Sequence, residues 1–120
     1  MRYLHAALTE SLRLYPSVPA DFKQAVEADY LPTGQYVPRG TKVMYVIYAM
    51  GRMESVWGPD ACQYRPERWL DDDGNFRHES PFTFPAFNAG PRLCLGKEMA
   101  YLQVSRCHTS RLWTLGWRTE

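Results

Sequence analysis

Apolar residues recur at helical spacing near the start of the chain, at Leu4, Leu8, Leu12 and Tyr15. Pro16 disfavours helical backbone at the residue before it, so the pattern predicts a helix over residues 2–15. No capping residue precedes this helix, and the chain begins inside an apolar pattern. That start indicates a fragment whose upstream part is missing.

Prolines and glycines interrupt residues 16–42 and predict short extended pieces joined by turns. A nearly continuous apolar run then extends from Lys42 to about Ala49, which predicts a strand covered on both faces. Met53 to Trp57 is expected to form one helical turn, ended by the Gly-Pro pair that follows.

No regular period is visible over residues 71–92, which are rich in Asp, Gly, Asn, Pro and Phe. Irregular segments this long are unusual in compact domains and are often functional. The segment leads into a second expected helix, over residues 95–110. The pattern as a whole favours a mainly α fold with small β-sheet elements, in the α+β class.

The composition excludes several classes of protein. With 120 residues, 45% hydrophobic and 22% charged, the chain is typical of one modest folded domain rather than a disordered segment. Its net charge of +1 and its scattered Lys and Arg residues give no basic face, so no nucleic-acid partner is expected. No apolar run approaches the roughly 20 residues that span a bilayer, and no signal peptide is visible. A membrane anchor is therefore expected only outside these residues.

Three widely spaced cysteines, Cys62, Cys94 and Cys107, are a poor framework for disulfides. The chain has no C-x-x-C pair, which excludes zinc-ribbon and thioredoxin motifs, and no C-x-x-C-H for covalent haem attachment. A cysteine is by default a small buried hydrophobe. A small metal-binding module on Cys62, Cys107 and His108 stays open as an interpretation that zinc titration tests.

Cys94 departs from that default because of its neighbours. Residues 87–96 read Phe-Asn-Ala-Gly-Pro-Arg-Leu-Cys-Leu-Gly and fit the pattern F-x-x-G-x-R-x-C-x-G. This segment resembles the haem-ligand loop of the cytochrome P450 family, and the whole loop is expected over residues 82–96. A thiolate at a helix N-terminus is stabilised by free backbone N–H groups and the helix dipole. The resemblance makes Cys94 the ligand of the haem iron.

The other four motif residues have roles that the resemblance implies. Gly96 lets backbone approach the sulfur, and Gly90 supplies a turn conformation that is strained for other residues. Arg92 is expected to pair with a haem propionate, and Phe87 to shield the sulfur side of the pocket from water. These four and Cys94 are the expected haem-binding residues, and none of them is expected to be catalytic.

Two further motifs resemble the same family. Residues 10–13, Glu-Ser-Leu-Arg, match its E-x-x-R pair, and residues 66–69, Pro-Glu-Arg-Trp, match a segment whose arginine joins that pair. Each motif alone is compatible with a surface salt bridge worth about 0.2–0.5 kcal/mol. Together they predict a buried network of Glu10, Arg13 and Arg68, which would lock the geometry around the cysteine without taking part in catalysis.

On this resemblance the chain is the C-terminal part of the cytochrome P450 fold, incomplete, as one partial domain over residues 1–120. Its parts are the E-x-x-R helix at 2–15, strands and the P-E-R-W segment at 16–70, the haem-ligand loop at 82–96, the following helix at 95–110 and an atypical tail at 104–120. The family's central oxygen-handling helix is missing. Apolar residues thin out in the tail, which indicates a shifted reading frame or an alternative splice end; an unshifted parent transcript would contradict this.

The resemblance implies a haem-thiolate monooxygenase with haem b as cofactor. Such an enzyme inserts one atom of O₂ into a C–H bond, with electrons from NADPH delivered by NADPH-cytochrome P450 reductase. Residues 49–60 and 82–87 are most similar to the plant fatty-acid omega-hydroxylase branch, so the expected substrate is a small-molecule lipid, a fatty acid. The parent protein is expected at the cytosolic face of the endoplasmic reticulum membrane, held by a missing N-terminal anchor.

A contrasting interpretation is that this polypeptide is a catalytically inactive truncated or splice-variant product that binds haem weakly or not at all. Elements without their packing partners leave apolar surface exposed, which disfavours folding alone. The carbon monoxide spectrum of the reduced, haem-treated chain separates the two interpretations.

Overall fold

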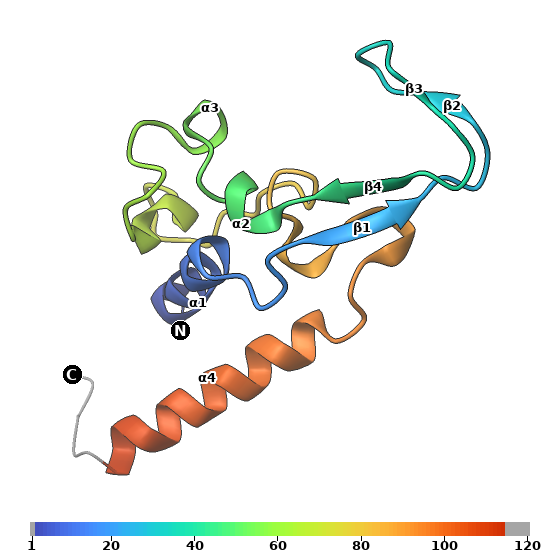
Figure 1. The fold of residues 1–120 in the computed structure, drawn as a ribbon. Coiled ribbons are helices and arrows are strands. Elements are labelled where there is room, and N and C mark those ends of the chain that lie inside the picture. Colours follow the sequence, from blue (N-terminus) through green and yellow to red (C-terminus); the bar gives the residue numbers. More distant parts are fainter. Residues whose placement is uncertain (1, 115–120) are drawn as a thin grey trace.

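Two long helices lie near the two ends of the chain, with short helices and strands between them in sequence (Figure 1). The computed structural model describes residues 2–114, with side chains as far as residue 107. The helices are α1 (Arg2–Leu14), α2 (Ile47–Met50), α3 (Glu54–Trp57) and α4 (Lys97–Thr114), with 3₁₀ turns η1 (Pro66–Trp69), η2 (Pro85–Phe87) and η3 (Gly90–Arg92). The strands are β1 (Asp21–Gln24), β2 (Asp29–Tyr30), β3 (Tyr36–Val37) and β4 (Lys42–Tyr45). The predicted mainly α fold with small β elements is confirmed.

Helix α1 ends at Leu14, close to the predicted stop before Pro16, but its buried face is not the leucine stripe. The residues turned inward are Ala6, Thr9, Glu10, Arg13 and Leu14. The stripe leucines are only half-buried, and the Tyr15 side chain is 70% exposed. Because turn η1 packs on the polar face, the most buried surface of α1 carries a carboxylate and a guanidinium.

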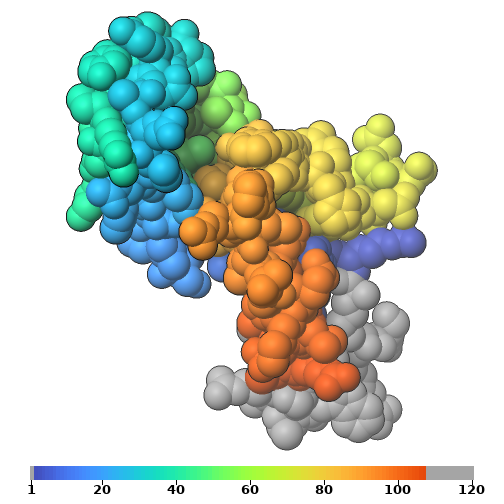
Figure 2. Space-filling view, turned by 90° about the vertical axis from the view of Figure 1, so that its right-hand side faces the viewer, coloured from blue at the N-terminus to red at the C-terminus, as the bar shows by residue number. Residues whose placement is uncertain are grey.

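The apolar run after Lys42 forms a strand only as far as Tyr45, and helix α2 begins at Ile47. The predicted strand to Ala49, covered on both faces, is therefore wrong. Among the described residues, strand β4 pairs only with β1, and its Met44 side chain is 66% exposed. An apolar run of this length is compatible with either a strand or a helix, and here it divides between them. Beyond this pair, β2 and β3 form an arm that projects from the body (Figures 1 and 2).

The apolar core is small and aromatic. Its buried members are Ala6, Trp57, Ala61 and Trp69, and the half-buried side chains of Leu70, Phe76 and Phe84 pack against it. The predicted helical turn is confirmed as α3, and Gly58 ends it at a φ of +85°, a conformation that favours glycine. The core therefore lies between α1, α3 and η1, and it contacts the irregular segment that leads to Cys94 through Phe76 and Phe84.

Helix α4 begins at Lys97, two residues later than predicted, and continues to Thr114, so it includes part of the expected tail. The Thr9 and Tyr101 hydroxyls lie 3.0 Å apart and join α4 to α1. Cys62 and Cys107 are exposed, so the default expectation of a buried thiol is wrong for both. No helix within residues 2–114 combines the length and the apolar character needed to cross a membrane. Residues 115–120 of the tail lie outside the described part.

Candidate functional site

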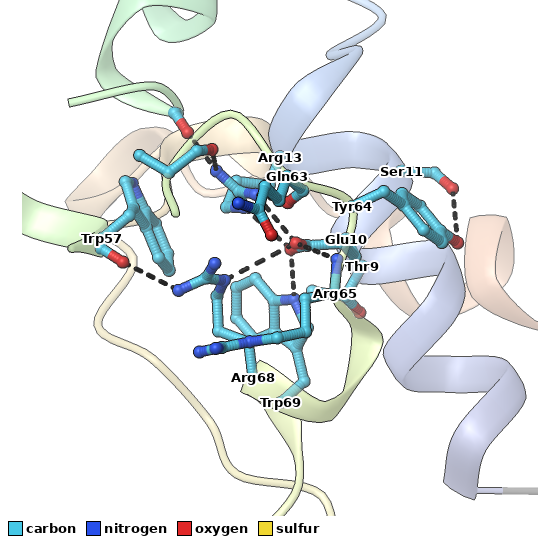
Figure 3. Close-up of polar contacts among 12 residues, drawn as sticks. Thr9, Glu10, Ser11, Arg13, Trp57, Gln63, Tyr64, Arg65, Arg68 and Trp69 are labelled. Atoms are coloured by element: carbon cyan, nitrogen blue, oxygen red, sulfur yellow. Dashed lines mark hydrogen bonds and ion pairs between the residues drawn. The ribbon is translucent and has the colours of Figure 1, made fainter. Parts of the chain in front are cut away.

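Glu10 and Arg13 lie side by side on the buried face of α1, one helical turn apart (Figure 3). Arg13 Nε donates to Glu10 Oε2 at 2.7 Å, and a terminal nitrogen of Arg13 donates to Glu10 Oε1 at 2.8 Å. Both side chains are completely buried. This is a bidentate pair, the strongest geometry that an arginine and a carboxylate can form.

The remaining donors of Arg13 bind backbone carbonyl groups from the segment after α2. They reach the carbonyl oxygens of Gly51, Ala61 at 2.6 Å and Gln63 at 3.1 Å. The guanidinium also lies over the Trp57 ring, 5.2 Å from its centroid. Since all five N–H groups have acceptors, the cost of burying this cation is met by hydrogen bonds on every side.

Glu10 accepts two further hydrogen bonds besides those of Arg13. The Arg65 backbone N–H donates to Oε1 at 3.0 Å, and the Trp69 indole N–H donates to Oε2 at 2.9 Å. Burial by itself raises the pKa of Glu10, but the hydrogen bonds from Arg13, Arg65 and Trp69 lower it overall below its ordinary value. Glu10 is therefore ionised at neutral pH.

Arg68 completes the cluster from η1. Its Nε lies 3.5 Å from Glu10 Oε1, and its terminal nitrogens lie 2.8 Å from the Trp57 carbonyl oxygen and 3.2 Å from Asp60 Oδ1. Only 7% of the Arg68 side chain is exposed. The structure thus brings together the three residues that the two charged motifs single out, and Glu10 and Arg13 form a buried pair rather than a surface salt bridge.

Several partners in this cluster were not expected from the sequence. Trp69 belongs to the P-E-R-W motif, but the sequence predicts no hydrogen bond for it. The signal that could have indicated one is that a buried indole N–H usually has an acceptor. The carbonyl groups of Gly51, Ala61 and Gln63 carry no signal in sequence, because every residue has one. The ring of Trp69 also contacts Phe84, with centroids 5.0 Å apart, so the cluster adjoins the segment that leads into the cysteine loop.

Cys94 lies on the short connection between η3 and α4, and its side chain is exposed. The Cys94 backbone N–H donates to the Phe87 carbonyl oxygen at 2.8 Å, which closes residues 87–94 into a tight loop. Lys97 N–H in turn points to the Cys94 carbonyl oxygen, at 3.4 Å, where α4 begins. The sulfur therefore stands next to the N-terminal, positive end of an 18-residue helix.

The glycines of this loop fit a site where a flat group approaches the sulfur. A Cβ atom placed on Gly96 would lie 3.8 Å from Cys94 Sγ, and glycine leaves that space open. Gly90 has a φ of +61°, the left-handed region that favours glycine. An accessible thiol beside a helix N-terminus, with no side chain at Gly96, has the donor chemistry that a haem iron requires.

The remaining motif residues lie at different depths. Arg92 is exposed on η3. Its side chain is therefore accessible to a carboxylate of a bound group. Phe87 is half-buried, and its ring centroid lies 5.4 Å from that of Tyr101 on α4. Phe87 and Leu93 line a cavity of about 180 Å³ between the loop, α1 and α4. Phe87 thus contacts Cys94 through its carbonyl group and packs its ring on α4.

A zinc-type site is not formed within the described residues. No group of three or more His, Cys, Asp or Glu side chains among them is arranged to hold a metal ion. The side chain of His108, one member of the alternative metal-binding set, lies outside the part whose side chains are described.

Comparison with known proteins gives one consistent family. The family model described as cytochrome P450 matches residues 1–118. Cytochrome P450 CYP94D108 of Paris polyphylla is 60% identical over 104 residues, which cover 87% of this chain and 21% of that relative. Cytochrome P450 86B1 of Arabidopsis thaliana is also 60% identical over 104 residues, or 87% of this chain and 18% of its own length.

Alkane hydroxylase MAH1 of Arabidopsis thaliana is 54% identical over 102 residues, which cover 85% of this chain and 20% of that relative. The chain therefore spans about a fifth of the length of the curated relatives it matches.

Proposed function

The chain belongs to the cytochrome P450 family, and from that premise we propose that Cys94 is the thiolate ligand of a haem b iron. The observation that carries the proposal is the accessible sulfur on a loop closed by the Phe87 carbonyl group and followed directly by α4. The thiolate is the form of a cysteine side chain that binds metal.

The other motif residues have supporting roles in this proposal. Arg92 would hold a haem propionate, Gly96 would keep the face of the sulfur open, and Gly90 would turn the chain so that Cys94 points outward. The cluster of Glu10, Arg13 and Arg68 would support the loop indirectly, because Trp69 binds Glu10 and its ring contacts Phe84. The Phe87 carbonyl group would hold the loop closed by accepting the Cys94 N–H bond, and the Phe87 ring would limit water near the sulfur.

The activity proposed for the whole protein is that of a monooxygenase that oxidises a fatty acid. A thiolate-bound haem supplies O₂ binding and the electron density that favours O–O cleavage. The fatty-acid assignment is supported by the likeness of residues 49–60 and 82–87 to plant omega-hydroxylases and by the relative named as an alkane hydroxylase. NADPH-cytochrome P450 reductase is the proposed electron donor, and the endoplasmic reticulum membrane the proposed location.

A second candidate is that these 120 residues alone form an inactive product. The observation that favours it is the large apolar surface that the chain leaves uncovered, including Phe82 at 72% and Met99 at 61% exposure around the cysteine loop. On this view the polypeptide would bind haem weakly or not at all, and it would not turn over a fatty acid.

Replacement of Cys94 by serine should abolish the thiolate-type spectrum. The haem-treated chain, reduced and exposed to carbon monoxide, is expected to show the red-shifted Soret band of a thiolate complex. Cys94→Ser should lose that band because a serine hydroxyl does not bind iron as a thiolate does. Cys62→Ser and Cys107→Ser are matched controls, since both thiols are also exposed but lie outside the loop.

Each outcome of this experiment is informative. A thiolate-type band that survives in Cys94→Ser would contradict the ligand assignment. Absence of the band from the unmodified chain would support the inactive-product alternative.

A further inference from the structure

A second polar cluster, with no residue in common with the cluster around Glu10, joins the paired strands to the cysteine loop. Asp21 and Tyr45 are direct partners across β1 and β4, and Lys23 lies two residues farther along β1, on the same face. Asn88 directly follows η2, and in sequence it lies 65 or more positions from Asp21 and Lys23. None of these four residues belongs to the motifs of the buried charge cluster.

The four side chains are connected by hydrogen bonds around the Asn88 amide. Asn88 Nδ2 donates to Asp21 Oδ2 at 3.2 Å, and Lys23 Nζ donates to Asn88 Oδ1 at 3.3 Å. The Tyr45 hydroxyl lies 2.7 Å from Asp21 Oδ2 and 2.6 Å from Asn88 Oδ1, and its single proton is donated to one of these two acceptors at a time. Every polar atom of the Asn88 side chain thus has a partner on the strands.

Asp21 is held as an anion by this arrangement. The Tyr45 hydroxyl is the first cause of a pKa well below the ordinary aspartate value, followed by the Phe22 backbone N–H and the Asn88 amide. The charge that organises the cluster is therefore present throughout the neutral range.

The backbone at Asn88 is unusual in a way that the side-chain contacts explain. Among the described residues, Asn88 alone combines a side chain with a positive φ, of 63°, and its ψ is −178°. That region is strained for any residue with a Cβ atom, and such residues persist when the surroundings hold them there. Glycine would adopt the conformation without strain, but glycine has no amide to bind Asp21, Lys23 and Tyr45.

The strained residue lies at the base of the cysteine loop. Asn88 directly follows Phe87, whose carbonyl oxygen accepts the Cys94 N–H bond at 2.8 Å. Asn88 N–H itself donates to the Pro85 carbonyl oxygen at 2.9 Å, so the peptide plane between Phe87 and Asn88 is fixed on both sides. A rotation at Asn88 would turn the Phe87 carbonyl group away from Cys94.

We propose that Asn88 is a positioning residue for Cys94: Asp21, Lys23 and Tyr45 clamp its amide, and the clamped backbone aims the Phe87 carbonyl at the Cys94 N–H. The paired strands β1 and β4 thereby fix the position of the Cys94 sulfur relative to the N-terminus of α4. This inference rests on the proposed haem-ligand role of Cys94 for its functional meaning, whereas the clamp is a property of the chain alone.

Amide hydrogen exchange in the 120-residue chain without haem tests the clamp. Tyr45→Phe removes the bridging hydroxyl, and exchange at the Cys94 amide should accelerate about tenfold or more, as expected for loss of a hydrogen bond to a charged group. The Arg65 amide, which donates to Glu10, should keep its rate because it lies in the other cluster. Tyr36→Phe in the projecting arm is a matched control and should change neither amide.

Substitution of Asn88 itself separates the clamp from simple relief of strain. Asn88→Gly permits the same backbone conformation without the amide, so it should accelerate exchange at Cys94 as Tyr45→Phe does. The double variant should show no further acceleration, because both changes break one linkage. Full protection of the Cys94 amide in Asn88→Gly or in Tyr45→Phe would overturn the proposal. Equal acceleration at Cys94 and Arg65 would also overturn it, because the cluster would then support the whole fold.

A spectrum provides a readout on the iron side. In the haem-loaded chain, Tyr45→Phe should reduce the fraction of the carbon monoxide complex that shows the thiolate-type band, while Tyr36→Phe leaves it unchanged. If exchange at Cys94 accelerates but the unmodified chain shows no thiolate band, the clamp stands, and the result supports the inactive-product alternative for these 120 residues. An unchanged band together with unchanged exchange would overturn the clamp and leave the ligand assignment intact.

Discussion

Glu10→Gln is expected to destabilise the chain by about 3–5 kcal/mol, because it leaves the buried Arg13 guanidinium without its anion and leaves Arg68 with Asp60 alone. Glutamine preserves the volume of the side chain, so the effect reports charge and hydrogen bonding rather than packing. Arg13 loses a bidentate partner at 2.7 and 2.8 Å, and Arg68 loses the ion pair at 3.5 Å. A folded chain typically has about 5–15 kcal/mol in total, so the variant should lose a large share of its stability. Urea unfolding followed by far-ultraviolet circular dichroism measures the difference.

The exposed pair of Arg77 and Glu79 provides the control for this prediction. These groups lie 2.8 Å apart, like the buried pair, but 59% of the Arg77 side chain is exposed. Glu79→Gln should therefore cost no more than about 1 kcal/mol. If Glu10→Gln were as mild as Glu79→Gln, the buried cluster would not be a main source of stability.

Gly51→Ala should be the most damaging replacement of a glycine by alanine. A Cβ atom at Gly51 would overlap the Arg13 carbonyl oxygen and lie 3.2 Å from the Arg13 carbonyl carbon, and neither backbone atom can move without shifting α1. The carbonyl group of Gly51 also accepts a hydrogen bond from Arg13. We expect a loss of about 1–3 kcal/mol or more in the free energy of unfolding, measured as a shift of the urea midpoint.

Gly96→Ala is the matched replacement for this measurement. Its new Cβ would meet Cys94 Sγ at 3.8 Å, an ordinary contact, so the free energy of unfolding should change little. A similar midpoint for the two variants would mean that the close approach of Gly51 to α1 is not required for stability.

The sequence predicts the long elements of this fold better than the faces they bury. Pro16 marks the end of α1 correctly, because its constraint on the preceding residue is local. The leucine stripe does not identify the buried face. Burial of Arg13 depends on carbonyl acceptors from the segment after α2, and burial of Glu10 depends on the Trp69 indole donor from η1. Only the resemblance of the two charged motifs singled out that face.

The limits of prediction are clearest in the apolar run after Lys42 and at Asn88. The run has no period that separates strand from helix, and the change between them at Val46 is settled by pairing of β4 with β1. The positive φ of Asn88 is equally hidden, because asparagine adopts many conformations and its partners lie on distant strands. Local constraints could therefore be predicted from the sequence, whereas contacts between distant segments could be predicted only where a motif resemblance named them, as for Glu10 and Arg68.

X-ray absorption at the iron K-edge of the haem-loaded chain tests most directly whether Cys94 binds the iron. One sulfur atom is expected to be bonded to iron in the unmodified chain, in Cys62→Ser and in Cys107→Ser, and none in Cys94→Ser. A haem-loaded chain whose iron has only nitrogen and oxygen neighbours, or one that keeps its sulfur neighbour after Cys94→Ser, would contradict this expectation.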